Sequence, residues 1–282
     1  MKDIRNFQRV VLKYWREHGR HDLPWRNTRD PYAILVSEIM LQQTQVDRVV
    51  PYFDRWLKRF PSVKSLAQAR LSDVLKEWQG LGYNRRAKLL RECAKEVVEK
   101  YSGKIPKDFA ALVALPAIGP YTAGAIRAFA FDESEVFVET NIRAALIHHF
   151  SPRSRKVPDS KLLPILQALL CKRGLHNKHT RYSASQIGPR IWYSALMDYG
   201  AYVKKTNPNP SRRSKHHTKQ SRFQGSLRQM RGDILRALVA SPSLRMRLLS
   251  RCHLDSRFEE AINSLEKEDL IEKDGNTWRL AR

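Results

Sequence analysis

The sequence predicts a mainly helical protein with a small α+β unit at its C-terminal end. Through most of the chain, apolar residues recur every three or four positions, which is the period of an amphipathic helix. No convincing alternation of apolar and polar residues, the pattern of a half-buried strand, occurs before residue 220. Near the end, Asp274-Gly275 separates two short β-prone runs, which is typical of a hairpin.

The first expected helix covers residues 4–18, and a loop with two prolines, 21–32, follows it. Further helices are predicted in succession, separated by short polar breaks. They cover about 32–41, 44–60, 71–79, 84–101, 108–115, 122–131, 141–150 and 160–172.

From Tyr199 to Gly232 the chain has no acidic residue and is rich in Lys and Arg. Its central part, "KKTNPNPSRRSKHHTKQSR", cannot bury much of itself, so we expect a basic loop over 199–222 that lies on the surface or on phosphates. A disordered linker between domains is the alternative.

The C-terminal stretch reads as a separate unit, and the expected domains are 1–222 and 223–282. "LRQMRGDILRALVAS" and "SRFEEAINSLEKEDLI" predict helices, "LRMRLLSRC" a short helix between them, and "IEKDGNTWRLA" two strands. This order resembles a winged-helix module. Such a module often binds DNA, but it can equally serve as a protein-contact or packing domain.

The charge balance points to a polyanionic partner. The 282 residues include 52 Lys plus Arg against 28 Asp plus Glu, a formal charge of +24, together with 42% hydrophobic residues, which suffice for an ordinary core. Nucleic acid is the first choice, because neutralised phosphates release counterions and strengthen binding. A merely solubilising basic surface is the alternative.

Cysteine usage and apolar runs bear on the compartment. The three cysteines, Cys93, Cys171 and Cys252, are far apart and form neither a disulfide framework nor a metal-ligand cluster. We see no signal peptide and no membrane span. The expectation is a soluble intracellular protein, cytoplasmic or nucleoid-associated if bacterial, that is monomeric and uses no cofactor or metal.

Two short segments carry candidate chemistry. "LPAIGPYTAGAI" (115–126) predicts a tight turn between two helices, whose outward backbone N–H groups can hold a phosphate. In "DPYAILVSEIMLQQTQV" (30–46), Glu38 lies on an apolar helix, where burial would raise its pKa and suit a general acid. The alternatives are a structural turn, a Glu38 that pairs with a buried Arg, and glutamines that only cap the helix.

Five segments in order resemble the MutY-type adenine glycosylases of the helix-hairpin-helix superfamily. They are "LPWRNTRDPY", "SEIMLQQTQV", "PYFDRWLKRFPSVKSLAQA", "VLKEWQGLGYNRRAKLL" and "LPAIGPYTAGAI", and the resemblance extends through "ALMDYGA" at 195–201. It implies the two-lobed helix-hairpin-helix DNA glycosylase fold, here followed by the winged-helix-like domain.

The resemblance also implies roles for individual residues. Glu38 corresponds to the acid that protonates the leaving base and handles water, and Tyr121 to a residue that lines the base pocket. Glu139 corresponds to the second carboxylate, which stabilises positive charge on the deoxyribose. Asn141 is expected to cap the next helix and orient that acid, and Gln43 to enter the base stack as the target is flipped out. The full set expected to contact DNA is Gln42, Gln43, Thr44, Tyr83, Asn84, Arg85, Ile118, Gly119, Thr122, Arg212, Arg213, Lys215 and Lys219.

The chain departs from the family in four places. The second carboxylate is normally aspartate, and Glu139 is one methylene longer. The family's iron–sulfur ligands would align with Lys204, Ser211, Ser214 and Gln220, which supply no thiolate. The tail is too short for an 8-oxoguanine-recognition domain. Asn84 stands where a second tyrosine is common, and Ala117 replaces a hairpin glycine.

The function expected from these residues is excision of adenine or a modified adenine from double-stranded DNA that holds a damaged or mispaired base. Lyase-competent relatives carry a hairpin lysine, which is absent here, so we expect a monofunctional enzyme that leaves an abasic site. The alternatives are a glycosylase for deaminated or alkylated purines such as hypoxanthine, and a catalytically silent binder of distorted DNA.

Overall fold

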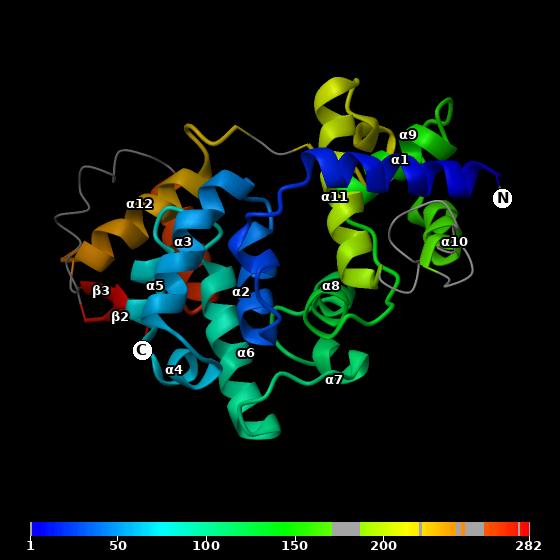
Figure 1. Ribbon diagram of the computed structural model, residues 1–282. Helices are drawn as coiled ribbons and strands as arrows, with labels where there is room; N and C mark the ends of the chain where they lie inside the picture. Colours follow the sequence, from blue (N-terminus) through cyan, green and yellow to red (C-terminus); the bar gives the residue numbers. More distant parts are fainter. Residues whose placement is uncertain are drawn as a thin grey trace. The chain divides into compact units, whose positions relative to one another are not determined.

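The computed structural model describes residues 2–170, 187–219, 222–240, 244–245, 257–275 and 277–281, and it is mainly helical as predicted (Figure 1). The chain divides into two compact units, each described by itself below. Unit 1 comprises Met1–Leu35, Lys107–Val113 and Ile118–Lys219, and unit 2 comprises Val36–Pro106, Ala114–Ala117 and Gln220–Arg282. Within the described residues, no helix is long and apolar enough to cross a bilayer.

Unit 1 is organised around the helix α11. It contains α1 (Lys2–His18), α7 (Phe109–Val113), α8 (Pro120–Phe131), α9 (Thr140–Phe150), α10 (Asp159–Leu170), α11 (Pro189–Thr206) and the 3-10 turns η1 (Pro24–Arg26) and η4 (Pro210–Arg213). Helices α1, α8 and α9 pack against α11 (Figure 1). The rings of Phe7, Trp192 and Tyr199 meet edge-on in the core between α1 and α11, and burial of such large aromatic side chains dominates core energetics.

Unit 2 begins inside α2 (Pro31–Leu41), which passes into it at Val36. It continues through α3 (Val46–Arg59), α4 (Val63–Gln68), α5 (Leu71–Trp78) and α6 (Arg85–Tyr101). Trp56 and Trp78 are fully buried, and their ring centroids lie 5.4 Å apart. Ser62 and Ser65 form a reciprocal capping box that starts α4, a helix that the sequence patterns did not predict.

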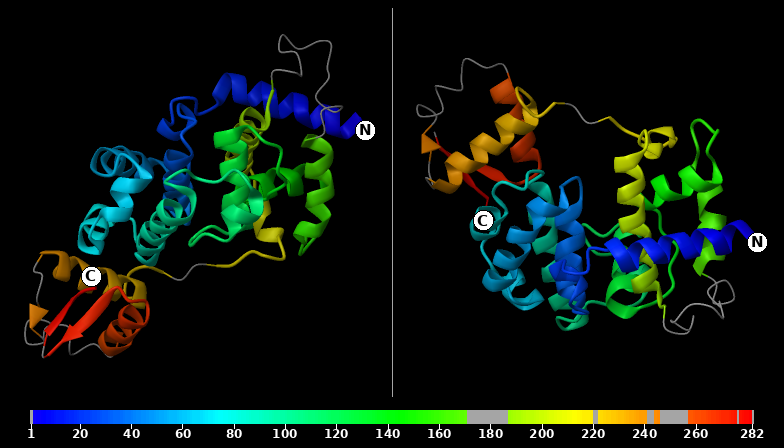
Figure 2. Two further views of the ribbon diagram at one scale, coloured as in Figure 1. Left: turned by 90° about the horizontal axis from the view of Figure 1, so that it is seen from below. Right: turned by 45° about the horizontal axis from the view of Figure 1, so that its top comes forward.

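The C-terminal part of unit 2 has two of the helices and the hairpin that the sequence predicts. Its elements are α12 (Leu227–Ala240), β1 (Leu244–Arg245), α13 (Arg257–Lys267), β2 (Ile271–Asp274) and β3 (Thr277–Leu280). The strands form an antiparallel sheet in the order β1-β3-β2, with Leu244 opposite Trp278 and Ile271 opposite Leu280. Figure 2 shows the sheet beside α12 and α13. This part contacts α5 through α12, and Lys88 of α6 forms an ion pair with Asp269 at 3.0 Å.

Two expectations need correction. The stretch 244–252 was predicted as a short helix, but residues 244 and 245 form β1 because they pair with β3; residues 246–252 lie outside the described residues. The basic loop was predicted to begin at residue 199, but α11 continues to Thr206 because Tyr199 and Val203 are buried on its inner face. The domain boundary between residues 222 and 223 stays a prediction.

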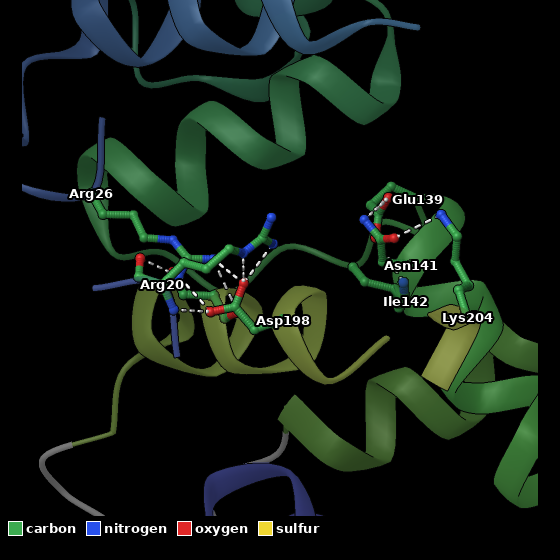
Figure 3. Close-up of polar contacts among 8 residues, drawn as sticks. Arg20, Arg26, Glu139, Asn141, Ile142, Asp198 and Lys204 are labelled. Atoms are coloured by element: carbon green, nitrogen blue, oxygen red, sulfur yellow. Dashed lines mark hydrogen bonds and ion pairs between the residues drawn. The ribbon is translucent and has the colours of Figure 1, made fainter. Parts of the chain in front are cut away.

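A buried carboxylate fixes the loop after α1 to α11. Asp198 is 3% exposed and accepts hydrogen bonds from the backbone N–H and Nε of Arg20 at 2.9 and 2.7 Å (Figure 3). The guanidinium of Arg26 donates to both carboxylate oxygens, at 2.6 and 2.9 Å. Burial alone would raise the pKa of Asp198, but the hydrogen bonds and charges of Arg26 and Arg20 together hold it below its usual value.

We predict that Asp198→Asn lowers the free energy of unfolding by about 3 kcal/mol at pH 7, because it leaves two arginines without their buried partner. The depressed pKa means that this contribution is present above the unfolded-state pKa, near 4, and is lost as the pH falls through the lower folded-state pKa. Urea unfolding from pH 7 down to pH 2.5 measures the difference. Asp22→Asn, an exposed change in the same loop, is the control, and an equal loss in both variants would contradict the prediction.

Candidate active site

Glu38 lies on the apolar helix α2. Its side chain is 5% exposed, and Val36, Ile39 and Met40 beside it are completely buried. The helix has apolar residues all round, because it forms part of a core rather than a surface. A carboxyl group in such surroundings requires hydrogen-bonding or charged partners, because burial removes it from water.

The turn after α2 holds Gln43 in a strained conformation. α2 ends at Leu41, and Gln43 has φ of 56°, in the left-handed region that costs a non-glycine residue about 1–3 kcal/mol. Gln43 is exposed, and the N–H of Thr44 donates to the carbonyl of Leu41. The chain maintains this conformation only because the surrounding structure enforces it.

Arg86 is the group that enforces it. Its Nη1 donates to the carbonyl oxygens of Ile39, Met40 and Gln42 at 2.7, 3.1 and 2.6 Å, and its Nη2 donates to the carbonyl of Gly82 at 3.1 Å. These bonds satisfy the last carbonyls of α2 and fasten the glutamine turn to the loop before α6. Burial lowers the pKa of Arg86 to about 10, so it still carries its charge at neutral pH.

Sequence reasoning named Arg85 and missed Arg86. The signal was present, because Arg86 lies one helical turn before Leu90, which is buried, whereas Arg85 is exposed. Arg86 therefore faces the core of unit 2, and Arg85 is available to a partner.

Tyr83 is held by cations from two elements. It has φ of 48°, and the guanidinium carbons of Arg86 and Arg228 lie 5.5 and 5.2 Å from its ring centroid. Arg228, on α12, also donates a hydrogen bond to its hydroxyl. Asn84 precedes α6 and makes no side-chain cap bond to it.

The predicted hairpin is present between α7 and α8. α7 ends at Val113, two residues before the predicted end, and Ala117 adopts φ of 65° where the family has glycine. Gly119 precedes α8, and its carbonyl accepts the N–H of Ala123 at 2.9 Å. Ile118 and Thr122 are 4% and 2% exposed, so any contact they make with DNA would come from main-chain groups.

Gly119 has no structural reason within the chain to be glycine. Its φ of −89° is open to any residue, and a Cβ added there would meet no atom within 4 Å. The position lies at the N-terminus of α8, where unpaired N–H groups and the helix dipole favour an anion. An absent side chain at such a place is what a close approach by a phosphate requires.

Tyr121 follows in the first turn of α8. Its ring meets Phe137 edge-on, with centroids 5.6 Å apart at 76°. Phe137 in turn stacks on Tyr193 at 4.0 Å, so Tyr121 rests on a rigid aromatic support.

Glu139 is the N-cap of α9. Its Oε1 accepts the N–H of Ile142 at 2.7 Å, and its Oε2 accepts Nδ2 of Asn141 at 3.1 Å (Figure 3). The expectation that Asn141 caps this helix was therefore wrong, because the carboxylate itself satisfies the helix N–H group. Asn141 does contact Glu139 as expected, and it also accepts a hydrogen bond from Nζ of Lys204 at 3.0 Å.

The environment of Glu139 contains opposing influences on its charge. Burial is the largest influence and holds the pKa of the carboxyl group above its usual value, and the hydrogen bonds from Asn141 and Ile142 and the charges of Lys204 and Arg143 oppose this effect. Both oxygens accept a hydrogen bond, which is the arrangement that stabilises the ionised form. The carboxyl group is thus held in one orientation at a helix N-terminus, by hydrogen bonds that favour its ionised form against the effect of burial.

The segment after α11 is folded by hydrogen bonds. Ser211 and Ser214, which the resemblance aligns with cluster ligands, are 4% and 6% exposed. The hydroxyl of Ser211 donates to Oδ1 of Asn209 at 2.7 Å, and that of Ser214 accepts the N–H of His216 at 3.0 Å. These oxygens do not suit an iron–sulfur cluster, which requires thiolates. Among the described residues, no group of three or more His, Cys, Asp or Glu side chains could hold a metal ion.

The predicted basic contacts of this segment divide into two kinds. Arg213 is partly buried and donates to the carbonyl oxygens of Ser151 and Ser154 at 3.0 and 3.5 Å, so it secures the loop. Arg212, Lys215 and Lys219 are exposed and available to phosphates.

Comparison with known proteins places this arrangement in a family. A family model described as HhH-GPD superfamily base excision DNA repair protein matches residues 36–168. The adenine DNA glycosylase of Mycolicibacterium smegmatis is 33% identical, over 94% of this chain and 92% of that protein. The chain is a MutY-like member of the HhH-GPD superfamily.

Other relatives match only part of their length. The adenine DNA glycosylases of Buchnera aphidicola and Rattus norvegicus are 40% and 42% identical over about half of this chain, which corresponds to 41% and 29% of those proteins. The chain thus spans less than half of these relatives.

The solved structures of the superfamily share the fold. A thermostable thymine-DNA glycosylase matches with a TM-score of 0.57 and 25% identity, over 71% of this chain and 87% of that one. An endonuclease III–DNA complex matches with a TM-score of 0.54 and 15% identity, over 79% and 89%.

We predict that Gly119→Ala weakens binding to duplex DNA by at least about tenfold, because the methyl group blocks a charge-assisted hydrogen bond between a phosphate and the hairpin backbone. Fluorescence anisotropy at fixed salt measures the affinity. The free energy of unfolding should change by less than about 1 kcal/mol, since the added Cβ meets nothing.

Gly124→Ala on the same helix is the matched control. Its Cβ would lie 2.8 Å from Phe137, so this variant should lose stability while the folded fraction still binds DNA. Unchanged DNA affinity in Gly119→Ala would contradict the role given to the hairpin.

Proposed function

We propose that this protein is a DNA glycosylase that hydrolyses the N-glycosidic bond of adenine, or of a modified adenine, in double-stranded DNA and leaves an abasic site. The observation that carries the proposal is the anchoring of Glu139. A carboxylate with both oxygens hydrogen-bonded at a helix N-terminus is held as an anion, which suits a group that stabilises positive charge on a sugar. The similarity to the adenine DNA glycosylase of M. smegmatis supports adenine as the base.

Glu38 supplies the complementary chemistry. As the C1′–N bond breaks, its electron pair passes to the base, and Glu38 donates a proton to that base. Water then adds to C1′ and gives its proton to the carboxylate of Glu38, which restores the acid. Glu38 is buried among apolar residues of α2, where we place the proton at the start, and the ionised form of Glu139 favours the cationic sugar between the two steps.

Access to the bond requires that the base leave the duplex. We assign this step to Gln43, which is exposed on its enforced left-handed turn, and to Tyr83 in the neighbouring loop that Arg86 joins to it. The main chain around Gly119 and the exposed Arg212, Lys215 and Lys219 hold the phosphates. Tyr121 lines the pocket for the extruded base. The protein acts as a monomer and needs no metal.

A duplex panel tests the substrate. Each duplex carries one site, namely adenine opposite guanine, adenine opposite 8-oxoguanine, hypoxanthine opposite thymine, or an undamaged pair, and alkali reveals the abasic product. Excision of adenine supports the proposal, and excision of hypoxanthine alone replaces adenine with a deaminated purine. Tight binding with no excision on any duplex would identify a silent binder and overturn the proposal.

We predict that Glu38→Gln lowers the single-turnover excision rate by at least about 100-fold, the range of general acid–base catalysis. Duplex affinity should stay within threefold of that of the unmodified protein, because the side chain is buried and the phosphates are assigned to other, exposed groups. Glu99→Gln, an exposed change on α6, is the control and should keep the full rate. A Glu38→Gln protein with undiminished excision would remove Glu38 from the mechanism.

We also predict that the protein has no lyase activity. Helix α8, "PYTAGAIRAFAF", contains no lysine that could attack the sugar as an amine. Incubation with the substrate duplex and borohydride should give no covalent protein–DNA complex, and strands should break only after alkali. A trapped complex would refute this part of the proposal.

A further inference from the structure

Lys204 reaches the candidate catalytic carboxylate through one intervening side chain. Its Nζ donates to Oδ1 of Asn141 at 3.0 Å, and Nδ2 of Asn141 donates to Oε2 of Glu139 at 3.1 Å (Figure 3). Lys204 is half-buried, whereas the next residue, Lys205, is exposed. The two neighbouring lysines therefore have different surroundings, and only Lys204 faces α9.

The chemistry of the three groups gives this chain of hydrogen bonds one direction. An ammonium group only donates, so the amide of Asn141 must turn its oxygen to Lys204. Its NH₂ group then faces Glu139, which as a carboxylate only accepts. Without Lys204 the amide can rotate and present its oxygen to the acid, which would repel the anion. Lys204 thus selects the amide orientation that holds Glu139 ionised.

The close packing of α11 on α9 places Lys204 there. Gly200 lies one helical turn before Lys204 on the same face of α11. A Cβ at Gly200 would lie 2.0 Å from the carbonyl oxygen of Asn141, so the helices approach to a distance that only glycine permits. The main chain of Asn141 rests on Gly200, and its side chain meets Lys204.

The positive charges of Lys204 and Arg143 both act on Glu139, but only Arg143 is also paired with another carboxylate among the described residues. Arg143, on α9, makes a two-pronged ion pair with Asp159 of α10 at 2.8 and 2.7 Å. Among the described residues, no carboxylate lies within 4 Å of Nζ of Lys204. Both cations lower the pKa of Glu139 against the effect of burial, and the charge of Lys204 acts with less compensation.

We propose that Lys204 is a positioning residue for base excision, which orients Asn141 and thereby holds Glu139 as the anion that stabilises the sugar cation. The inference rests on the proposed function of Glu139. The resemblance aligns Lys204 with an iron–sulfur ligand of the family. In this chain, the residue at that position acts on the chemistry through Asn141.

The test is the pH dependence of single-turnover excision by the full chain. Lys204→Met should lower the rate at pH 7 by about tenfold, the loss expected from one charge-assisted hydrogen bond. The acidic limb of the profile should move to higher pH, because loss of the cation makes Glu139 harder to ionise. Lys204→Arg, which keeps the charge and a donor, should restore most of the rate and return the limb.

Lys205→Met is the matched control, since it removes one charge from the adjacent residue. Its profile should equal that of the unmodified protein, and the two Met variants should bind duplex DNA within threefold of each other. In an Asn141→Ala background, Lys204→Met should cost less than about threefold, because the connection is already broken. Thermal melting shows whether each variant is folded. If Lys204→Met is unfolded, the rate and pH profile of Lys204→Arg still test the inference.

Two outcomes overturn the inference. The first is a Lys204→Met protein whose rate and profile match those of Lys205→Met. The second is a borohydride-trapped complex that Lys204→Met abolishes, which would make Lys204 a nucleophile instead. Glu139→Gln separates failure of the inference from failure of the proposed function. If Glu139→Gln keeps full excision, the proposed role of Glu139 is wrong. If Glu139→Gln loses excision and Lys204→Met does not, only the inference about Lys204 is wrong.

Discussion

The contact between α9 and α11 at Gly200 is the constraint on which the candidate site depends. Because Gly200 has no side chain, the main chain of Asn141 can lie against α11, and the N-terminus of α9 is fixed there. That N-terminus carries Glu139 as its cap, so the orientation of one helix determines the direction of the carboxylate. Two residues earlier on α11, Asp198 binds Arg20 and Arg26, and the same helix therefore anchors both the site and the loop after α1.

Three residues in the segments assigned to DNA have a strained backbone. Gln43, Tyr83 and Ala117 all have left-handed backbones without being glycine. Each conformation is unfavourable locally and persists only where other groups enforce it. Arg86 supports both Gln43 and Tyr83, because its guanidinium donates to the carbonyl oxygens of the residues that precede them, Gln42 and Gly82. A side chain on such a support enters a base stack without first losing conformational freedom.

Periodic patterns predicted most of the fold because most helices expose one face and bury the other. The first residues of α1, α6 and α13 lie within two positions of the predicted helix starts. The strands on either side of the predicted hairpin turn at Asp274 also pair with each other. The sequence patterns missed α11, since Trp192, Tyr193 and Leu196 are buried around most of its circumference and leave no polar stripe. The pairing of β1 was equally hidden, because a two-residue strand depends on β3, which lies far along the chain.

For the site, the resemblance predicted the acids but not the groups that hold them. Glu139 was expected to be oriented by a capping Asn141, but Glu139 itself is the cap, and Asn141 donates a hydrogen bond to it. The bonds of Arg86 and Lys204 run between helices that are distant in sequence, so no local pattern predicts them. The only local sign of this arrangement is the spacing of Gly200 and Lys204, which are one helical turn apart.

The hydroxyl groups of Ser211 and Ser214 have a consequence for how the protein matures. A loop built around a metal cluster reaches its final form only after the metal arrives, and its folding is then coupled to metal supply. Here Asn209 receives the hydroxyl of Ser211, and the backbone of Val157 pairs with that of Arg213 and Lys215, all within the same chain. The contacts that hold this segment are therefore supplied by the chain itself, so the folding of these residues is not coupled to metal supply.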